Sequence, residues 1–206
     1  TPVAVSLPSG RTASSVFAGQ YHTCALLDDG FVYCWGDNYY GQLGDGNSGH
    51  GFSSSTPIKV TPGGGPSSTM SAISVSAGGS YTCAVFDNDK IKCWGRNYYG
   101  QIGDGSTTTR TTPTYVDLPS GRTATSVYAG QRHACAILDD TSLYCWGYNN
   151  KGQLGDGTTT NRNTPVVVSL PSGRTASSVS AGQEHTCAVL DDASLYCWGD
   201  NGNGEL

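Results

Sequence analysis

Residues 19–38 read GQYHTCALLDDGFVYCWGDN, and this stretch decides the fold because three further copies of it follow. The copies are GGSYTCAVFDNDKIKCWGRN at residues 78–97, GQRHACAILDDTSLYCWGYN at residues 130–149 and GQEHTCAVLDDASLYCWGDN at residues 182–201. The first cysteines of the copies are separated by 59, 52 and 52 residues. A regular period of this size indicates a repeat protein in which each copy is one structural unit.

Each repeat unit of about 50 residues contains four strand-like runs. In the third they are TPTYVDL, ATSVYAG, HACAILD and SLYCWG, and turn-forming residues such as PSGR separate them. Four strands in a period of about 50 residues predict an all-β fold, a β-propeller of four-stranded blades. The alternative is a β-solenoid, whose periods are usually shorter. We expect one domain over residues 1–206, with units at approximately 1–46, 47–105, 106–157 and 158–206.

Two polar, Gly-rich stretches, NSGHGFSSS at 47–55 and TPGGGPSST at 61–69, lengthen the first step and predict enlarged loops. The first seven residues, TPVAVSL, match the run that ends each unit's β-sheet, so one expectation is that they pair with the last blade and close a small ring, and an equally supported one is that the chain is part of a larger ring. Strand sharing between chains remains an alternative. No signal peptide precedes Thr1, which indicates a mature form or part of a longer protein.

All eight cysteines occur in pairs ten residues apart, with a turn at each midpoint. In a hairpin about that turn the two β-carbons would lie opposite each other at about 4.5–5.5 Å, close to the roughly 3.5–4.5 Å of a disulfide. We therefore expect the disulfides Cys24–Cys34, Cys83–Cys93, Cys135–Cys145 and Cys187–Cys197. One pair in every repeat indicates an oxidising compartment, and hence a secreted or cell-surface location.

Reduced buried thiols and a metal site are the alternatives for the cysteines. His22, His133 and His185 share a strand face with their cysteine pairs, but Tyr81 replaces histidine in the second copy and the C-x9-C spacing is unusual for zinc. We expect no metal and no cofactor, and we interpret the histidines as groups that bridge strands within each blade.

Composition excludes two partner classes. Only 13 % of the residues are charged, the formal net charge is −5, and the 11 basic residues are scattered. Nucleic-acid binding depends on clustered Lys and Arg, so we expect no nucleic-acid partner. No stretch of about 18 apolar residues occurs, so we expect no membrane insertion.

The pattern AGxxHTCALxxDGxVYCWGxNxxGQLGDG resembles the repeat of the regulator of chromosome condensation family, over essentially the whole chain. The residues that carry the resemblance are the glycines of GQLG, the glycine of AG and the tryptophan of WG: Gly41, Gly44, Gly100, Gly103, Gly152, Gly155; Gly19, Gly78, Gly130, Gly182; Trp35, Trp94, Trp146, Trp198. The resemblance implies a propeller, typically of seven blades. The paired cysteines look more like bacterial secreted or cell-surface members than nuclear ones.

The family's functions vary, so the resemblance leaves function open. The nuclear member is an exchange factor that binds chromatin, plant members perceive ultraviolet-B light through a tryptophan cluster, and a bacterial member inhibits β-lactamase through aromatic loops. This chain is acidic and has one tryptophan per repeat, so the last mechanism is the nearest analogue.

Catalytic chemistry has little support in the sequence. The paired aspartates predict hairpin turns, the Asp-Gly pairs lack the alternating acidic ligands of a calcium loop, and no serine lies in a nucleophile elbow. We therefore predict that the protein is not an enzyme.

The loops between WG and GQLG differ between copies and carry Tyr and Arg, which are enriched at binding hot spots. The candidate binding residues are Tyr39, Tyr40, Arg96, Tyr98, Tyr99 and Tyr148. One tyrosine of each pair can instead pack between blades. We predict a secreted protein-binding or scaffolding propeller, with a protein partner or self-association into a homo-oligomer. A carbohydrate-binding or hydrolytic propeller with a central-channel site and a self-assembling surface fibre or coat remain alternatives.

Overall fold

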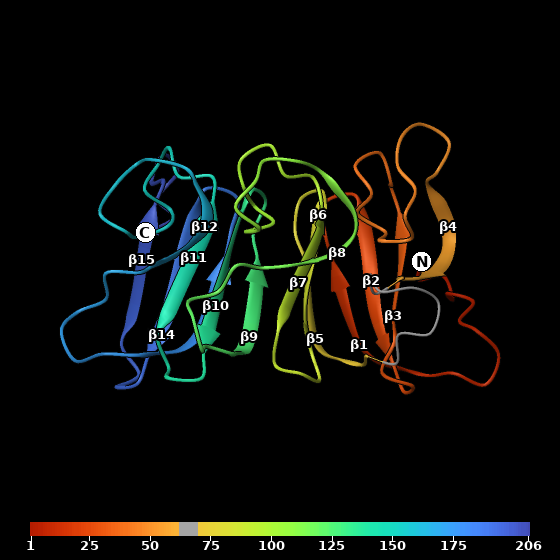
Figure 1. The fold of residues 1–206 in the computed structure, drawn as a ribbon, viewed down its shortest axis with the longest axis horizontal. Coiled ribbons are helices and arrows are strands. Elements are labelled where there is room, and N and C mark those ends of the chain that lie inside the picture. Colours follow the sequence, from red (N-terminus) through yellow and green to blue (C-terminus); the bar gives the residue numbers. More distant parts are fainter. Residues whose placement is uncertain (62–69) are drawn as a thin grey trace.

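A computed structural model describes residues 1–61 and 70–206, and in these ranges it has fifteen β-strands and no α-helix. The strands form four separate antiparallel sheets, three with four strands and one with three. Figure 1 shows the sheets side by side as the blades of a propeller. The predicted all-β propeller with four repeats is therefore confirmed. The predicted loop at residues 61–69 lies, except for Thr61, outside the described residues.

The strands follow each other from the inner to the outer edge of each blade. Blade 1 contains β1 (Ala13–Ala18), β2 (His22–Leu27), β3 (Val32–Gly36) and β4 (Ser54–Lys59). Blade 2 contains β5 (Ala72–Ala77), β6 (Tyr81–Phe86), β7 (Ile91–Gly95) and β8 (Arg110–Tyr115). Blade 3 contains β9 (Ala124–Ala129), β10 (His133–Leu138), β11 (Leu143–Gly147) and β12 (Arg162–Val167). Blade 4 contains β13 (Ala176–Ala181), β14 (His185–Leu190) and β15 (Leu195–Gly199). The TPxxV runs fall in the outer strands β4, β8 and β12, in agreement with the expectation that this run ends a β-sheet.

A hairpin at the centre of each blade carries the cysteine pair. The turn of the first hairpin forms because the Asp29 carboxylate accepts a hydrogen bond from the Phe31 N–H at 3.1 Å, as an Asx turn requires. The register places Cys24 opposite Cys34, with α-carbons 4.1 Å apart. The other three pairs have the same arrangement, and the structure contains the four disulfides that the ten-residue spacing predicts.

The hydrophobic core lies between blades. Leu43 at the end of blade 1 and Trp94 of blade 2 are both completely buried in one cluster. The Trp94 indole N–H also donates to the Gln42 carbonyl of blade 1 at 2.9 Å. Gly44 has φ of +71°, and a β-carbon there would lie 2.6 Å from that indole nitrogen. The GQLG and WG motifs therefore form one inter-blade contact, and Trp146 and Trp198 donate to Gln101 and Gln153 in the same way.

The inner strands converge on a hub formed by the AG glycines. The amide of Gln20 donates to the Gly78 carbonyl at 3.2 Å, that of Gly79 to Gly130 at 3.3 Å, and that of Gln131 to Gly182 at 3.0 Å. A β-carbon at Gly78 would lie 2.5 Å from the Gly130 carbonyl oxygen. Only glycine permits this close approach, which explains the AG signature.

The four blades form an open arc, with the N- and C-termini toward opposite ends of it (Figure 1). Residues 1–7 form no strand, and blade 4 has only three strands. The expected pairing of these residues with the last blade of the same chain is therefore wrong for this structure. The blades pack in sequence, β2 against β5, β6 against β9 and β10 against β13, and this series leaves blades 1 and 4 at opposite ends (Figure 1).

Candidate functional site

The loops between the WG and GQLG motifs all leave their blades at the same end of the strands. A buried asparagine organises each of the first three. In blade 2 the side-chain oxygen Oδ1 of Asn97 accepts from the Ile102 N–H at 2.9 Å, and the side-chain Nδ2 donates to the backbone carbonyls of Ser106 and Thr108 at 3.1 and 3.0 Å. Asn38 and Asn149 are likewise fully buried. The loops are therefore held in a fixed conformation.

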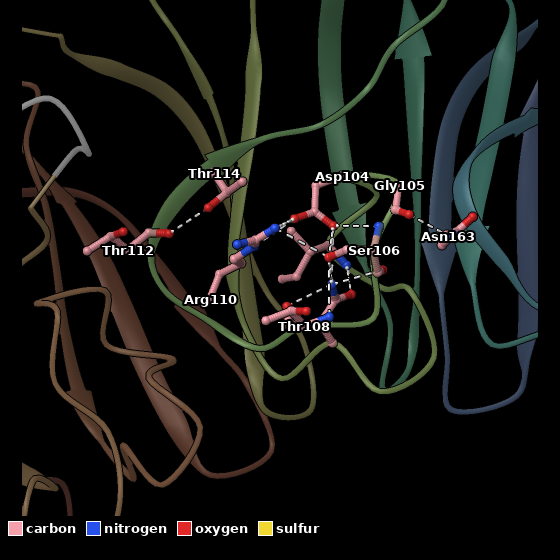
Figure 2. Close-up of polar contacts among 10 residues, drawn as sticks. Asp104, Gly105, Ser106, Thr108, Arg110, Thr112, Thr114 and Asn163 are labelled. Carbon is pink, nitrogen blue, oxygen red and sulfur yellow. Dashed lines mark hydrogen bonds and ion pairs between the residues drawn. The ribbon is translucent and has the colours of Figure 1, made fainter.

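The Asp104 carboxylate fastens the far side of the same loop (Figure 2). It accepts hydrogen bonds from Ser106 and forms an ion pair with Arg110 at 2.6 Å. Burial opposes ionisation of Asp104, but the hydrogen bonds from Ser106 and Arg110 outweigh it and hold the pKa of the carboxyl below its ordinary value. Asp156 and Arg162 repeat the arrangement in blade 3. The aspartates of the Asp-Gly pairs thus act as loop anchors.

On this scaffold the predicted binding residues meet in one continuous series. The Tyr39 and Tyr40 rings lie 4.8 Å apart, Tyr40 lies 5.7 Å from Tyr98 of the next blade, and Tyr99 lies 4.6 Å from Tyr148 of the blade after that. The first tyrosine of each pair is the exposed one, with 43 % of Tyr39 and 55 % of Tyr98 accessible. Tyr40 and Tyr99 are half-buried, and their rings contact tyrosines of the next blade. These two residues therefore match the alternative in which one tyrosine of each pair packs between blades.

Two arginines connect the rings. The Arg96 guanidinium carbon lies 5.1, 5.0 and 5.8 Å from the ring centroids of Tyr40, Tyr98 and Tyr99. Arg132 lies 5.7 Å from Tyr99 and 5.5 Å from Tyr148. We define the tyrosine–arginine face as the six predicted residues together with two that join them, His50 and Arg132. Each close cation–π contact contributes about 0.5–1 kcal/mol at a partly exposed site, so the arginines help to fix the rings.

Sequence reasoning missed His50 and Arg132. The His50 ring lies 4.7 Å from Tyr39, and it belongs to the inserted loop of blade 1. Arg132 follows the AGQ motif at a position that varies between copies, as Tyr21, Ser80 and Glu184. The backbone carbonyl of that position accepts a hydrogen bond from the residue after WG in all four blades. Both residues occupy places where the copies differ in sequence or length, and this difference is the signal that could have identified them.

Acidic groups border this face on the blade 4 side. Arg132 lies 3.7 Å from the Glu184 carboxylate, and Lys151 lies 3.0 Å from Asp200. The hydrogen bond and charge of Asp200 raise the pKa of Lys151. On the blade 1 side, the Asp37 carboxylate accepts from the Gln42 amide at 2.6 Å. The face is therefore aromatic and basic at its centre and acidic at both ends.

His22 and His133 connect blades rather than strands of one blade, so the earlier interpretation is wrong for these two histidines. His22 Nε2 lies 2.8 Å from Thr82 Oγ1 of the next blade. That hydroxyl donates to the Gln42 carbonyl, so His22 must donate to it from Nε2. His133 and Thr186 repeat the contact. Burial lowers the pKa of His22 and of His133 to about 4, which leaves both rings neutral near pH 7.

The hub offers the central-channel site that the sequence left open. A depression of about 350 Å³ lies there, and its lining consists of alanine, glycine and glutamine residues. These residue types supply hydrogen bonds but no acid–base pair.

No helix in the described part of the chain has the length and apolar character needed to span a membrane.

Comparison with known proteins identifies the repeat. Two profiles of the regulator of chromosome condensation (RCC1) repeat match the chain, one at residues 29–85, 91–137 and 140–189, the other at residues 13–42, 72–101, 124–153 and 176–205. The ultraviolet-B receptor UVR8 of Arabidopsis thaliana is 32 % identical over 100 % of this chain and 45 % of its own length. The human E3 ubiquitin-protein ligase HERC2 is 31 % identical over 97 % of this chain but only 4 % of its own length.

Solved structures show the same fold. Yeast RCC1 (Prp20) superposes with a TM-score of 0.80 at 23 % identity, over 98 % of this chain and 46 % of that one. Human WBSCR16 superposes with a TM-score of 0.79 at 24 % identity, over 92 % of this chain and 48 % of that one. The chain thus spans about half the length of the solved propellers, and less than half of the curated relatives.

Proposed function

We propose, from the premise that this chain belongs to the regulator of chromosome condensation (RCC1) repeat family, that it is a protein-binding propeller without catalytic activity. Its contact surface is the tyrosine–arginine face. A role in protein binding agrees with the solved fold relatives, since yeast RCC1 (Prp20) has been solved bound to Kap60 and studied for its binding to Gsp1p and histones.

One observation carries the proposal. Seven aromatic or arginine side chains from three consecutive blades contact each other in an unbroken series, from Tyr39 to Tyr148. Tyrosine and arginine dominate binding hot spots because they bury a large area at low conformational cost. The asparagine and aspartate anchors already hold the loops, so little further order is lost on binding.

The four disulfides support an extracellular setting for this binding, since such bonds form and persist in oxidising compartments. A hydrolytic function at the hub is less well supported, because the depression is lined without titratable side chains. We therefore place the function on the loops and not in the channel.

Self-assembly by strand sharing is the second candidate, and one observation favours it. Residues 1–5 read TPVAV, like the outer strands at 56–60, 112–116 and 164–168. The last residues of those runs, Val60, Val116 and Val168, are buried, whereas Val5 is 48 % exposed. Residues 1–7 of a second copy therefore fit the outer edge of blade 4, which has three strands in this structure. Sedimentation velocity tests this: Val5→Asp should abolish concentration-dependent assembly, and a monomer at every concentration would rule it out.

Partner capture tests the main proposal. The chain is immobilised as wild type, as a Tyr39→Ala/Tyr98→Ala variant and as a Tyr115→Ala variant, and proteins retained from the extracellular fraction of the source cells are quantified. Tyr115 is a matched control because it is 51 % exposed but lies on β8, away from the loops. We expect a protein retained by wild type and by Tyr115→Ala and lost with the double variant. Equal retention by all three would place the binding surface elsewhere.

A further inference from the structure

Arg96 differs from every other arginine in the chain. The other six each lie within ion-pair distance of a carboxylate: Arg11 with Asp28 and Asp29, Arg110 with Asp104, Arg122 with Asp139 and Asp140, Arg132 with Glu184, Arg162 with Asp156, and Arg174 with Asp191 and Asp192. Within residues 1–61 and 70–206, Arg96 has no such partner. In a chain with 16 acidic residues and a net charge of −5, one arginine without a carboxylate is unusual.

The surroundings of Arg96 are aromatic. Three tyrosine rings lie around its guanidinium, at 5.0–5.8 Å from ring centroid to guanidinium carbon. Its Nε atom is buried and has no hydrogen-bond acceptor. Ring faces attract the cation but do not accept the five N–H groups of a guanidinium in the way that oxygen atoms do. The site is therefore positioned and charged, and it lacks an acceptor.

Carboxylate is the acceptor that suits this site. A guanidinium binds a carboxylate through two parallel N–H···O bonds, and apolar ring walls strengthen such a pair by excluding water. A polyanion fits less well, because the ends of the face carry Asp37 on one side and Glu184 and Asp200 on the other. These carboxylates would repel a run of phosphates but leave room for one acidic side chain between uncharged neighbours.

We propose that Arg96 receives a single aspartate or glutamate side chain of the protein partner, beside the exposed ring of Tyr98. This inference rests on the proposed function of the tyrosine–arginine face. It identifies the chemistry that the face recognises: one acidic residue flanked by uncharged residues. Arg132 is less suited to bind a partner carboxylate, because the Glu184 carboxylate already lies beside its guanidinium.

A random peptide display library selected against the wild-type chain tests the proposal. From the selected peptides, we keep those that bind the wild type but not Tyr98→Ala. Each is then synthesised twice, once with its acidic residue and once with that residue replaced by the corresponding amide. Binding is measured against wild type, Arg96→Ala, Arg96→Lys and Arg174→Ala. Arg174 is the control because it loses the same charge at the opposite end of the strands, beside Asp191 and Asp192.

The expected result is that one acidic position recurs in the selected peptides. Replacing that acid by its amide, or Arg96 by alanine, should each weaken binding about tenfold or more, and the two changes together should add little. Arg96→Lys should recover only part of the affinity, since lysine lacks the planar fork, and Arg174→Ala should bind like wild type.

Three outcomes overturn the inference, and they are distinguishable. Peptides that depend on Tyr98 but bind equally as acid or amide would contradict the role of Arg96 and leave the binding face intact. Selection of no peptide that depends on Tyr98 would remove the binding face as well. Binding of a single-stranded oligonucleotide that competes with the peptides and depends on Arg96 would show that the acceptor is phosphate.

Discussion

Replacing Trp94 by alanine should show how much the contact between two blades contributes to the stability of the protein. Its side chain is fully buried, packs against the Leu43 cluster of the preceding blade and donates to the Gln42 carbonyl at 2.9 Å. Truncation of a buried Trp to Ala typically costs about 3–5 kcal/mol. The lost hydrogen bond adds little because Gln42 keeps its 3.0 Å bond from Thr82 Oγ1. We therefore expect Trp94→Ala to lower the free energy of unfolding by about 4 kcal/mol.

Trp35 supplies the matched control. It occupies the same repeat position, but it is half-buried and donates no hydrogen bond to another blade within the described residues. Trp35→Ala should cost only about 1–2 kcal/mol. Urea unfolding followed by circular dichroism measures both, and with a slope of about 2 kcal/mol per molar the midpoints should move by roughly 2 M and less than about 1 M.

Equal midpoint shifts for the two variants would refute the argument, because stability would then not depend on contacts between blades. Trp94→Phe guards against a variant that does not fold. It keeps one six-membered aromatic ring, loses the N–H donor and leaves a smaller cavity than alanine does, so it should lower the free energy of unfolding by about 1–3 kcal/mol.

Three further predictions concern pH, disulfides and the hub. The folded-state pKa values of His22 and His133 are about 4, below the ordinary 6.5, so the folded state binds fewer protons than the unfolded state and stability is lost as the pH falls from 6.5 to 4. The loss amounts to about 3 kcal/mol for each buried histidine. Urea midpoints measured across that pH range test this, and a flat profile would contradict it. Cys83→Ser/Cys93→Ser should lower the free energy of unfolding by about 2–3 kcal/mol, and the intact mass with and without reductant should report four bonds in the wild type, whereas free thiols would exclude them. Gly78→Ala should destabilise the protein by about 1–3 kcal/mol, since its β-carbon would lie 2.5 Å from a carbonyl of blade 3, and a neutral effect by thermal melting would show that the hub tolerates wider spacing.

The repeat made much of the fold predictable. The spacing of Cys24 and Cys34 about a turn predicts a hairpin, and the hairpin fixes the register that joins them. The tryptophan of WG was recognisable as a structural mark, but its partner was not, because the acceptor is a backbone carbonyl of the preceding blade. A single side-chain pattern carries no information about a backbone atom of another repeat.

The tyrosine–arginine face was predictable in composition but not in geometry. The Tyr pairs stood out because they occupy loops that differ between otherwise similar copies. Whether Tyr40 reaches Tyr98 depends on the angle between blades, which inter-blade packing sets and the sequence does not express. The isolation of Arg96 depends on where all the acidic residues lie, so only the folded chain reveals it.

Hydrogen–deuterium exchange of the wild-type chain, free and saturated with its tightest selected peptide, tests the central claim most directly. The account predicts slower exchange in the loops that follow the WG motifs, at residues 37–53, 96–101 and 148–153, and unchanged exchange at the PSGR turns on the opposite end of the blades. Protection confined to the PSGR turns, the hub or the outer edge of blade 4 would contradict it.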